Sequence, residues 1–325
     1  MRIRRFGNTD LTASEVGFGL WTLTTGWWGD RSEDEAIALV RKAYDLGVTF
    51  FDTADTYGEG YGETFLATAL GAHRDDITIA TKFGYDFYNN TERRGQQERP
   101  HDWSPKFVRF ALEQSLMRLN TDHIDLWQLH NARLDAAHND ELWETLDAIV
   151  QEGKVRYIGA AMGPANGWLE DGLAFLQMRP ITAIHIIYNI LEQHPGEDFL
   201  LHCPDTCGAM VRVPHSSGML EGHYTAETTF PPNDHRLHRP KWWLTEGIKK
   251  VETLRFLEQE HDLTMAQASI KWLLAHPRIT TVLPNIYDEA QLVEFTEAPA
   301  REDLSPADLV RIRDLYRQDF CASQA

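Results

Sequence analysis

Eight short apolar or β-branched runs alternate with segments of helical periodicity along the chain, and this alternation constrains the fold most strongly. The runs cover residues 16–21, 48–54, 77–83, 124–130, 155–161, 181–189, 208–214 and 280–284. Their near-continuous apolarity is typical of parallel strands that are covered on both faces. A strand-then-helix order repeated eight times favours an α/β fold, a closed, parallel, eight-stranded (β/α)8 TIM barrel. An open doubly wound sheet is the alternative.

Local signals mark the expected helix starts. Ser32 and Glu35 have the spacing of a capping box, and Thr264 and Gln267 repeat it. Gly47 follows the first of these helical segments and supplies a stop signal. These signals support helices between the predicted strands.

Two segments fall outside the eightfold repeat. Residues 2–14, with a Gly-Asn pair at positions 7–8, predict an N-terminal hairpin that closes the barrel floor. Residues 241–261 carry apolar side chains at helical spacing and predict one additional packed helix. Because no low-complexity linker or composition shift divides the chain, we expect residues 1–325 to form a single domain.

The composition excludes several classes of partner. The chain has 31 Lys plus Arg against 49 Asp plus Glu, a net charge of −18. Such an acidic surface repels phosphate backbones and anionic leaflets, so we expect no nucleic-acid partner and no membrane partner. No stretch approaches the roughly 20 apolar residues of a membrane span, and no apolar signal core follows the basic N-terminus. Three cysteines cannot build a disulfide framework, which favours a cytoplasmic location. The oligomeric state is left open.

Four polar residues lie at the ends of three consecutive predicted strands. Asp52 and Tyr57 follow the second run, Lys82 is near the end of the third, and His130 ends the fourth. The carboxyl ends of barrel strands share one mouth, so these side chains should converge there. A tyrosine has a pKa of about 10, and a nearby ammonium lowers it. With a carboxylate to hold the lysine and a histidine to orient the substrate, the set suits proton transfer to a carbonyl.

Each residue alone also has a structural explanation. Asp52 could cap a turn, Tyr57 could be a rim aromatic, and His130 could be a hydrogen-bonded core histidine. A purely structural role explains Lys82 less well, because a lysine within an apolar run needs a polar partner when it is buried. The coincidence of all four at adjacent strand ends favours catalysis.

The segments around these residues resemble the aldo-keto reductase family in its bacterial form. Residues 50–63 (FFDTADTYGEGYGE) resemble the family's D-T-A-x-x-Y segment, residues 80–84 (ATKFG) its lysine strand, and residues 124–131 (IDLWQLHN) its histidine strand. Residues 152–159 (EGKVRYIG) resemble the turn into strand five. The resemblance implies a (β/α)8 barrel and reversible hydride transfer between a nicotinamide nucleotide and a carbonyl or alcohol. It implies a catalytic tetrad of Asp52, Tyr57, Lys82 and His130.

The cofactor side departs from the family pattern. Where strand five usually ends in a Ser-Asn pair that holds the nicotinamide amide, this chain has Ala161 and Met162. The usual glutamine of strand six is His185. The aromatic that strand seven often offers to the ring is Arg212, whose guanidinium can also stack on a ring. Either His185 and backbone groups substitute, the ring lies differently, or these changes have no functional consequence.

The resemblance implies NADP(H) as the first choice of nucleotide, with NAD(H) as the alternative. Gln291 and Glu294 match positions that contact adenine. Asp288 stands where a base often grips the 2′-phosphate, and a carboxylate would instead accept from a ribose 2′-hydroxyl; it could also simply cap the following helix. The cofactor-binding residues expected on this basis are Trp21, Asp52, His185, Arg212, Asn285, Asp288, Gln291 and Glu294.

Aromatic residues follow the first and third strands and predict an aromatic pocket mouth. The expected substrate-pocket residues are Trp21, Trp27, Trp28, Tyr85, Trp103 and Asn131. Such a mouth suits apolar, ring-shaped or sugar substrates, although loop packing explains the same residues. No metal site is expected, because the His/Cys groups at 202–207 and 235–238 lack a full ligand set.

The sequence therefore predicts an NAD(P)-dependent oxidoreductase that acts on a small-molecule carbonyl or alcohol, with Tyr57 as general acid/base. The alternative is a barrel that binds a nicotinamide nucleotide and senses redox state with negligible turnover. A metal-assisted hydrolase or isomerase is a third class, and it would need a carboxylate/His cluster at the strand ends.

Overall fold

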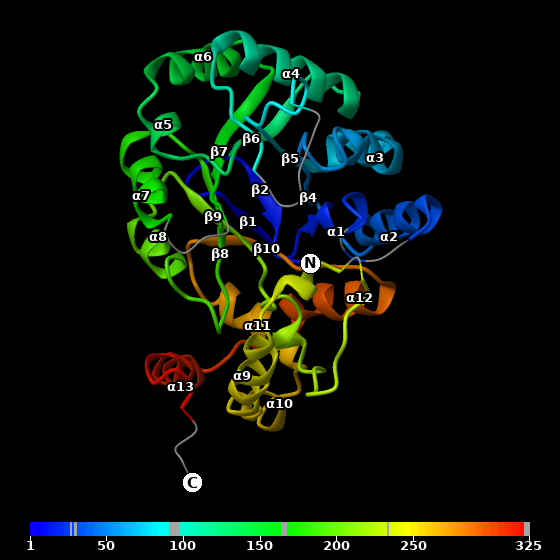
Figure 1. The fold of residues 1–325 in the computed structure, drawn as a ribbon, viewed down its shortest axis with the longest axis vertical. Coiled ribbons are helices and arrows are strands. Elements are labelled where there is room, and N and C mark those ends of the chain that lie inside the picture. The colour runs from blue at the N-terminus through cyan, green and yellow to red at the C-terminus, as the bar shows by residue number, and fades with distance from the viewer. Residues whose placement is uncertain (27, 29–30, 91–97, 164–167, 233, 322–325) are drawn as a thin grey trace.

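The computed structural model describes residues 1–26, 28, 31–90, 98–163, 168–232 and 234–321, and its centre is a parallel eight-stranded barrel (Figure 1). The strands neighbour one another in the order β10-β9-β8-β7-β6-β5-β4-β3. A parallel bridge between Val16 and Val282 brings the chain before β3 against β10 and closes the sheet. The predicted closed barrel is thus confirmed, and the open-sheet alternative is wrong.

Each barrel strand overlaps one of the eight predicted runs. The strands are β3 (Phe18–Gly19), β4 (Phe50–Asp52), β5 (Thr78–Phe83), β6 (Ile124–His130), β7 (Val155–Ala161), β8 (Ala183–Ile187), β9 (Gly208–Arg212) and β10 (Ile279–Leu283).

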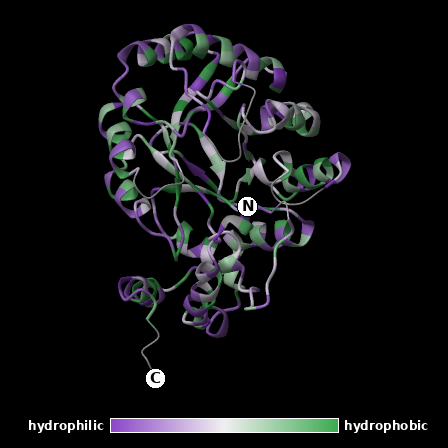
Figure 2. Ribbon diagram, viewed as in Figure 1, coloured by the Kyte–Doolittle hydropathy of each residue, from purple (hydrophilic) through white to green (hydrophobic). Residues whose placement is uncertain are grey.

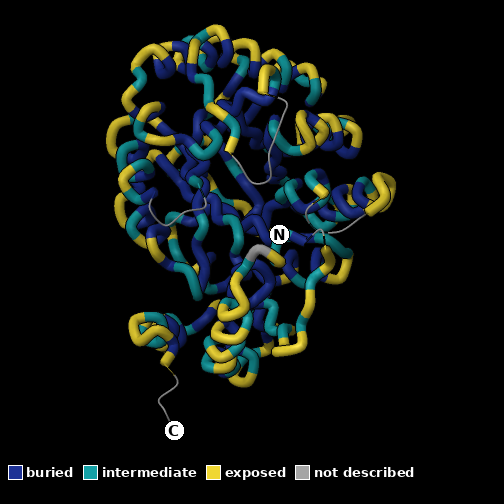
Figure 3. Tube along the Cα trace, in the orientation of Figure 1, coloured by how far each residue is buried: buried dark blue, intermediate teal, exposed yellow. Residues whose placement is uncertain are grey.

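Helices surround the strands, with hydrophobic residues toward the barrel and polar, exposed residues outward (Figures 2 and 3). The α-helices are α1 (Trp21–Thr24), α2 (Glu33–Asp45), α3 (Tyr61–Leu70), α4 (Pro105–Leu119), α5 (Leu134–Ala137), α6 (Asp140–Gln151), α7 (Leu169–Met178), α8 (Gly196–His202), α9 (Lys241–Glu252), α10 (Phe256–Gln259), α11 (Met265–Leu274), α12 (Glu289–Glu297) and α13 (Pro306–Arg317). Short 3-10 helices are η1 (Gly71–Asp76), η2 (Met219–Glu221), η3 (His235–His238) and η4 (Ala298–Ala300).

Both predicted capping boxes are present. The Ser32 side chain accepts from the backbone N–H of Glu35 at the start of α2, and the Glu35 side chain accepts from the Ser32 backbone. Thr264 and Gln267 make the same reciprocal pair at the start of α11. Two otherwise unsatisfied backbone donors are bonded at each helix start, which explains where these helices begin.

The predicted N-terminal hairpin closes the barrel floor. β1 (Ile3–Arg5) pairs antiparallel with β2 (Thr12–Ser14). Phe6 and Leu11 between them belong to a buried cluster with Phe50 and Ala183, which begin β4 and β8. The hairpin therefore covers the end of the barrel opposite the carboxyl ends of its strands.

The prediction of one helix over residues 241–261 is wrong, because the segment forms α9 and α10 with a bend at residues 253–255. Val251, Leu254 and Leu257 are all buried in a second hydrophobic cluster that includes Ile312 of α13. With this bend, all three side chains lie in the same hydrophobic cluster. No glycine or proline marks it in the sequence.

No helix in the described part of the chain is long and apolar enough to cross a membrane. Among the same residues, no group of three or more His, Cys, Asp or Glu side chains is placed to hold a metal ion.

Candidate active site

Three adjacent strands bring the predicted tetrad to one end of the barrel. Asp52 ends β4, Lys82 lies one residue before the end of β5, and His130 ends β6. β4 pairs with β5, and β5 pairs with β6. Tyr57 follows β4 in the loop before α3, so all four residues lie at the carboxyl side of the sheet.

Lys82 is the centre of a buried hydrogen-bond network. Its Nζ donates to Asp52 Oδ2 at 2.6 Å, to the Thr53 carbonyl oxygen at 2.6 Å and to the Tyr57 hydroxyl at 3.3 Å. Gln128 Nε2 donates to the other Asp52 oxygen at 3.0 Å. The ammonium therefore has a fixed position beside the phenol. Sequence reasoning missed Thr53 and Gln128, because neither contact has a local signal.

Glycines shape the loop that carries Tyr57. Gly58 and Gly60 have φ of 59° and 97°, in the left-handed region that favours glycine. A Cβ on Gly62 would lie 2.7 Å from Thr53 Oγ1 and 3.0 Å from Tyr57 Cβ. The glycine-rich segment therefore packs closely against the tyrosine, in agreement with the tight turn that its composition predicts.

The electrostatics of Tyr57 differ from the sequence expectation. Burial raises the pKa of Tyr57, and the charges of Lys82 and Arg212 oppose that rise without cancelling it. The expected net lowering of this pKa is therefore wrong, although Lys82 acts in the expected direction. Burial lowers the pKa of Lys82, but Asp52 and Tyr57 together hold it above the usual value, so Lys82 stays an ammonium ion.

His130 lies beside the tyrosine and is uncharged. The two rings meet edge to face with centroids 6.1 Å apart, and His130 Nδ1 is 3.4 Å from Thr56 Oγ1. Burial, helped by the charges of Lys82 and Arg212, holds the pKa of His130 well below its usual range. A neutral imidazole can donate one N–H to a substrate oxygen.

His185 on β8 is buried beside the tetrad without a hydrogen-bond partner among the described residues. Its side chain is buried, and neither ring nitrogen has a hydrogen-bond partner. Its Nδ1 lies 4.0 Å from Asp52 Oδ1, and burial keeps the pKa of His185 well below its usual range. Because buried polar atoms are nearly always bonded, a neutral imidazole here offers one donor and one acceptor to a bound group.

Arg212 ends β9 on the same side of the barrel. One of its terminal nitrogens donates to the Met162 carbonyl oxygen at 2.6 Å. No carboxylate of the described residues forms a salt bridge with it. Its charge nevertheless reaches Tyr57 and Asp52.

Two of the predicted tryptophans, Trp21 and Trp28, lie together in the segment that follows β3. Trp21 and Trp28 pack edge to face at 5.9 Å, and Trp28 stacks on Tyr287, also at 5.9 Å. The guanidinium of Arg236 covers the Trp28 ring at 4.5 Å. Trp27 lies outside the described residues. Loops after β3, β9 and β10 therefore share one aromatic cluster.

Tyr85 and Asn131 lie beside His130, whereas Trp103 is part of the core. The Tyr85 hydroxyl accepts from Asn131 Nδ2 at 2.8 Å and donates to Glu98. Its ring meets His130 edge to face at 5.0 Å. Trp103 is only 7% exposed and packs on Phe83, with its indole N–H on Asp135. The loop-packing alternative therefore describes Trp103.

The start of α12 is more acidic than the sequence reasoning expected. Asp288 is the N-cap residue, and its Oδ1 accepts from the Gln291 backbone N–H at 2.8 Å, so the capping alternative is confirmed. Gln291 Nε2 donates to Glu221 Oε2 at 3.0 Å. Burial raises the pKa of Glu221 to about 7, and Glu294 and Asp288 contribute to the rise. Asn285 follows β10 and is half-buried.

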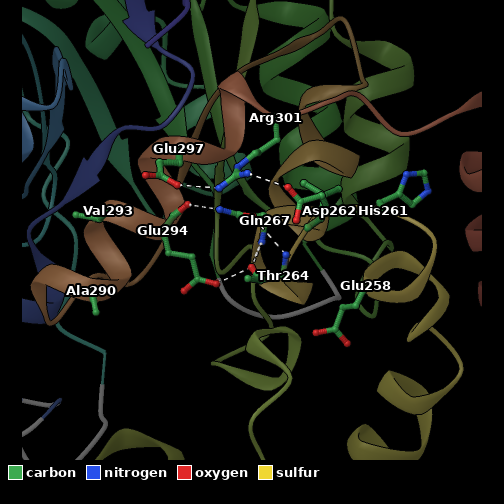
Figure 4. Close-up of a pocket in the computed structure, with 11 residues that line it drawn as sticks. Glu258, His261, Asp262, Thr264, Gln267, Ala290, Val293, Glu294, Glu297 and Arg301 are labelled. Carbon is green, nitrogen blue, oxygen red and sulfur yellow. Dashed lines mark hydrogen bonds and ion pairs between the residues drawn. The ribbon is translucent and has the colours of Figure 1, made fainter.

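A separate cavity of about 470 Å³ lies between α10, α11 and α12 (Figure 4). Glu294 lines it and accepts from Thr264 Oγ1 at 2.5 Å. No tetrad residue lines this cavity. Glu294 therefore faces the start of α11 and a cavity that the tetrad does not line.

Comparisons with known proteins agree with this geometry. The model of the Aldo/keto reductase family matches residues 15–317. The chain is 28% identical to the uncharacterized oxidoreductase YqkF of Bacillus subtilis over 98% of both chains. It is 27% identical to the NADH-specific methylglyoxal reductase of Escherichia coli over 95% of this chain and 96% of that one. The holo form of aldo-keto reductase AKR11C1 from Bacillus halodurans superposes with a TM-score of 0.76 at 29% identity, covering 97% and 96% of the two chains. This chain, with its buried Asp52–Lys82–Tyr57 network at the barrel mouth, belongs to the aldo/keto reductase family.

Proposed function

We propose that this enzyme interconverts a small-molecule carbonyl compound and its alcohol with a nicotinamide nucleotide, and that Tyr57 is the general acid/base. The observation that carries the proposal is the position of the Lys82 ammonium, bonded to Asp52 at 2.6 Å and to the Tyr57 hydroxyl at 3.3 Å. An ammonium held by a carboxylate beside a phenol stabilises the phenolate that proton donation leaves behind.

The side chains have distinct parts in the reduction. A reduced nicotinamide held by residues such as His185 and Arg212 would supply the hydride for the carbonyl carbon. Tyr57 donates its proton to the carbonyl oxygen as the C=O bond becomes single, and the phenolate that remains is paired with Lys82. His130, which is neutral, donates its N–H to the same oxygen and orients it. Because burial raises the pKa of Tyr57, the residue keeps its proton until the substrate takes it.

The polar atoms at the buried end of the site support binding of a nicotinamide there. The two ring nitrogens of His185 that lack partners match a carboxamide, which has one acceptor oxygen and donor N–H groups. We therefore propose that His185 takes the part of the missing Ser-Asn and Gln side chains. Other proposed nucleotide contacts are those expected from the resemblance: Trp21, Asp52, Arg212, Asn285, Asp288, Gln291 and Glu294.

We propose that both reduced nucleotides bind, with discrimination under about 100-fold, or less than roughly 2.7 kcal/mol. NADP(H) is the family expectation, but a 2′-phosphate of nearly −2 charge needs positive partners. Burial, with contributions from Glu294 and Asp288, raises the pKa of Glu221 beside α12. The acidic groups gathered there oppose such a charge. NAD(H) therefore gains support from the local chemistry.

Trp21, Trp28, Tyr85 and Asn131 are proposed to line the substrate pocket, with Trp103 supporting it from the core. Tyr85 and Asn131 bond to each other beside His130. Aromatic walls suit substrates with apolar or C–H faces.

Replacing the proposed acid tests the mechanism. We expect Tyr57→Phe to lower the rate of carbonyl reduction by about 10²–10⁴-fold, the range for one general acid, while nucleotide affinity stays similar. Tyr44→Phe is the matched control, because Tyr44 lies on α2 and its hydroxyl bonds to Asp76 outside the barrel. Full activity in Tyr57→Phe would exclude Tyr57 as the acid.

We also propose a second candidate function, because the residues expected to contact the nicotinamide depart from the family pattern at His185 and Arg212. In this alternative the barrel binds the nucleotide and senses its redox state with negligible turnover. Binding without turnover across a panel of carbonyl compounds would favour it.

A further inference from the structure

We call the side chains of Asp52, Tyr57, Lys82, His130, His185 and Arg212 together the catalytic chamber. This group holds a positive charge that no carboxylate of the described residues balances. The Lys82 ammonium and the Asp52 carboxylate form a pair at 2.6 Å and cancel each other. Burial lowers the pKa of both His130 and His185 far enough that neither ring is charged at neutral pH. Arg212 is left over, and the chamber therefore has a net charge of about +1.

The contacts of Arg212 support this count. Its guanidinium donates to the uncharged Met162 carbonyl oxygen at 2.6 Å, and no described carboxylate lies within salt-bridge distance. Burial lowers the pKa of Arg212, and the opposing effects of Tyr57, Asp52 and Tyr85 do not cancel that lowering. A guanidinium with a pKa above about 12 in water keeps its charge in such a site.

Arg212 also lies near the reacting centre. It ends β9 beside β8, the strand that carries His185, and its guanidinium reaches the Met162 carbonyl oxygen just after β7. Its charge also acts on Tyr57, Asp52 and Tyr85. Hydride transfer requires the nicotinamide ring to contact the carbonyl carbon, and proton transfer requires the carbonyl oxygen to reach the Tyr57 hydroxyl. A ring bound for that transfer would lie close to the Tyr57 hydroxyl, where the charge of Arg212 also acts.

The two redox states of the ring respond differently to that field. An oxidised nicotinamide ring carries one positive charge, and a reduced ring carries none. We propose that Arg212 is a redox-state specificity residue, which makes the chamber bind the reduced nucleotide more tightly than the oxidised one. The inference rests on the proposed function, since it assumes that the nicotinamide occupies this chamber.

This difference in affinity favours carbonyl reduction over alcohol oxidation as the direction of catalysis. The oxidised nucleotide that carbonyl reduction produces would be repelled by Arg212 and would be released faster. Alcohol oxidation would have to begin by binding the disfavoured state. The overall equilibrium in solution is unchanged, but the enzyme is poised as a reductase.

The expected size follows from Coulomb's law at the effective dielectric of a protein site. Unit charges several ångströms apart at a dielectric near 20 change a binding constant by one to two orders of magnitude. We expect the reduced nucleotide to bind about 30-fold tighter than the oxidised one, or roughly 2 kcal/mol. The acidic outer surface attracts the oxidised ring only weakly and so reduces this preference little, because salt screens exposed charges beyond about 10 Å.

Dissociation constants measured on the full chain test the proposal without any turnover. NADH and NAD⁺, and NADPH and NADP⁺, are titrated against the parent by calorimetry or tryptophan quenching. The variants are Arg212→Gln, which removes the charge and keeps a donor for Met162, and Arg212→Lys, which keeps the charge. Arg313→Gln on α13 is the matched control, since it removes one exposed charge whose ion-pair partner among the described residues is the adjacent Asp314.

We expect a parent ratio of about 30, a ratio below about 3 in Arg212→Gln, and a largely retained ratio in Arg212→Lys and Arg313→Gln. A parent ratio below threefold, or an unchanged ratio in Arg212→Gln, would overturn the proposal. If Arg212→Gln does not fold, the parent ratio and the Lys variant still decide it. Failure of every nucleotide to bind would instead refute the proposed function.

Discussion

At the residue scale, the balance between burial and the Lys82 charge sets the pKa of Tyr57. Burial raises the pKa of Tyr57, and the Lys82 charge opposes that rise. Lys82→Met removes the opposing charge, so the pKa of Tyr57 should rise further. Carbonyl reduction needs the protonated phenol, and the basic limb of its pH–rate profile should move upward while the rate falls.

The pH dependence of kcat/KM, measured for the parent and Lys82→Met, checks this prediction. Lys249→Met is a suitable control, because Lys249 is an exposed residue on α9 paired with Glu246. An unchanged profile in Lys82→Met would mean that Lys82 has only a structural role.

A second residue-scale prediction concerns Asp55, which is fully buried with neither carboxyl oxygen hydrogen-bonded. Burial, with a contribution from Glu63, holds the pKa of Asp55 well above its usual value. The folded protein therefore keeps a proton that the unfolded chain releases above about pH 4, and stability falls as pH rises through this window. Asp55→Asn removes this loss.

Thermal unfolding midpoints across pH 5 to 8 would show the difference. We expect Asp55→Asn to lose less stability than the parent as the pH rises. Equal slopes for the two proteins would contradict the assignment of a neutral, buried Asp55.

At the element scale, α12 tests the position of the nucleotide. Asp288 caps this helix, and Asp288→Arg should cost about 0.5–2 kcal/mol of stability through the lost cap. The same change adds a bidentate phosphate donor and removes a repulsive charge, so it should shift nucleotide preference toward NADPH. Asp288→Asn keeps a capping side chain and is the matched control for the charge alone.

Dissociation constants for NADH and NADPH on the parent and both variants measure the shift. A parent that already prefers NADPH a thousandfold would contradict the account of α12. An Asp288→Arg variant whose nucleotide preference does not shift would also contradict it, because Asp288 would then not face the ribose.

Elements also show what a sequence can and cannot predict. The i, i+3 pairs at Ser32 and Thr264 are local, and both capping boxes form as predicted. The tetrad could be predicted because strand ends of a barrel converge. The bend at residues 253–255 could not, since no glycine or proline marks it and the partners of the buried Leu254 lie on other helices. The Glu221–Gln291 bond joins residues 70 positions apart, so no local pattern marks it.

At the scale of the whole molecule, two hydrophobic clusters share a side chain. Trp272 packs both against the main barrel cluster and against the cluster of α9, α10 and α13. We therefore propose that residues 1–325 form a single domain, and predict that tryptophan fluorescence and far-ultraviolet circular dichroism report one coincident thermal transition. Two separated transitions would mean that the outer helices unfold independently of the barrel.

The central claim is that this barrel turns over carbonyl compounds with a reduced nicotinamide nucleotide. The most direct measurement follows the absorbance of NADH and NADPH with the purified protein and a panel of aldehydes and ketones, beside nucleotide titrations of the same sample. The account predicts loss of the reduced-nicotinamide band with at least one carbonyl compound, and its near-absence in Tyr57→Phe. Tight nucleotide binding with no turnover of any compound in the panel would contradict it and favour a redox-sensing barrel.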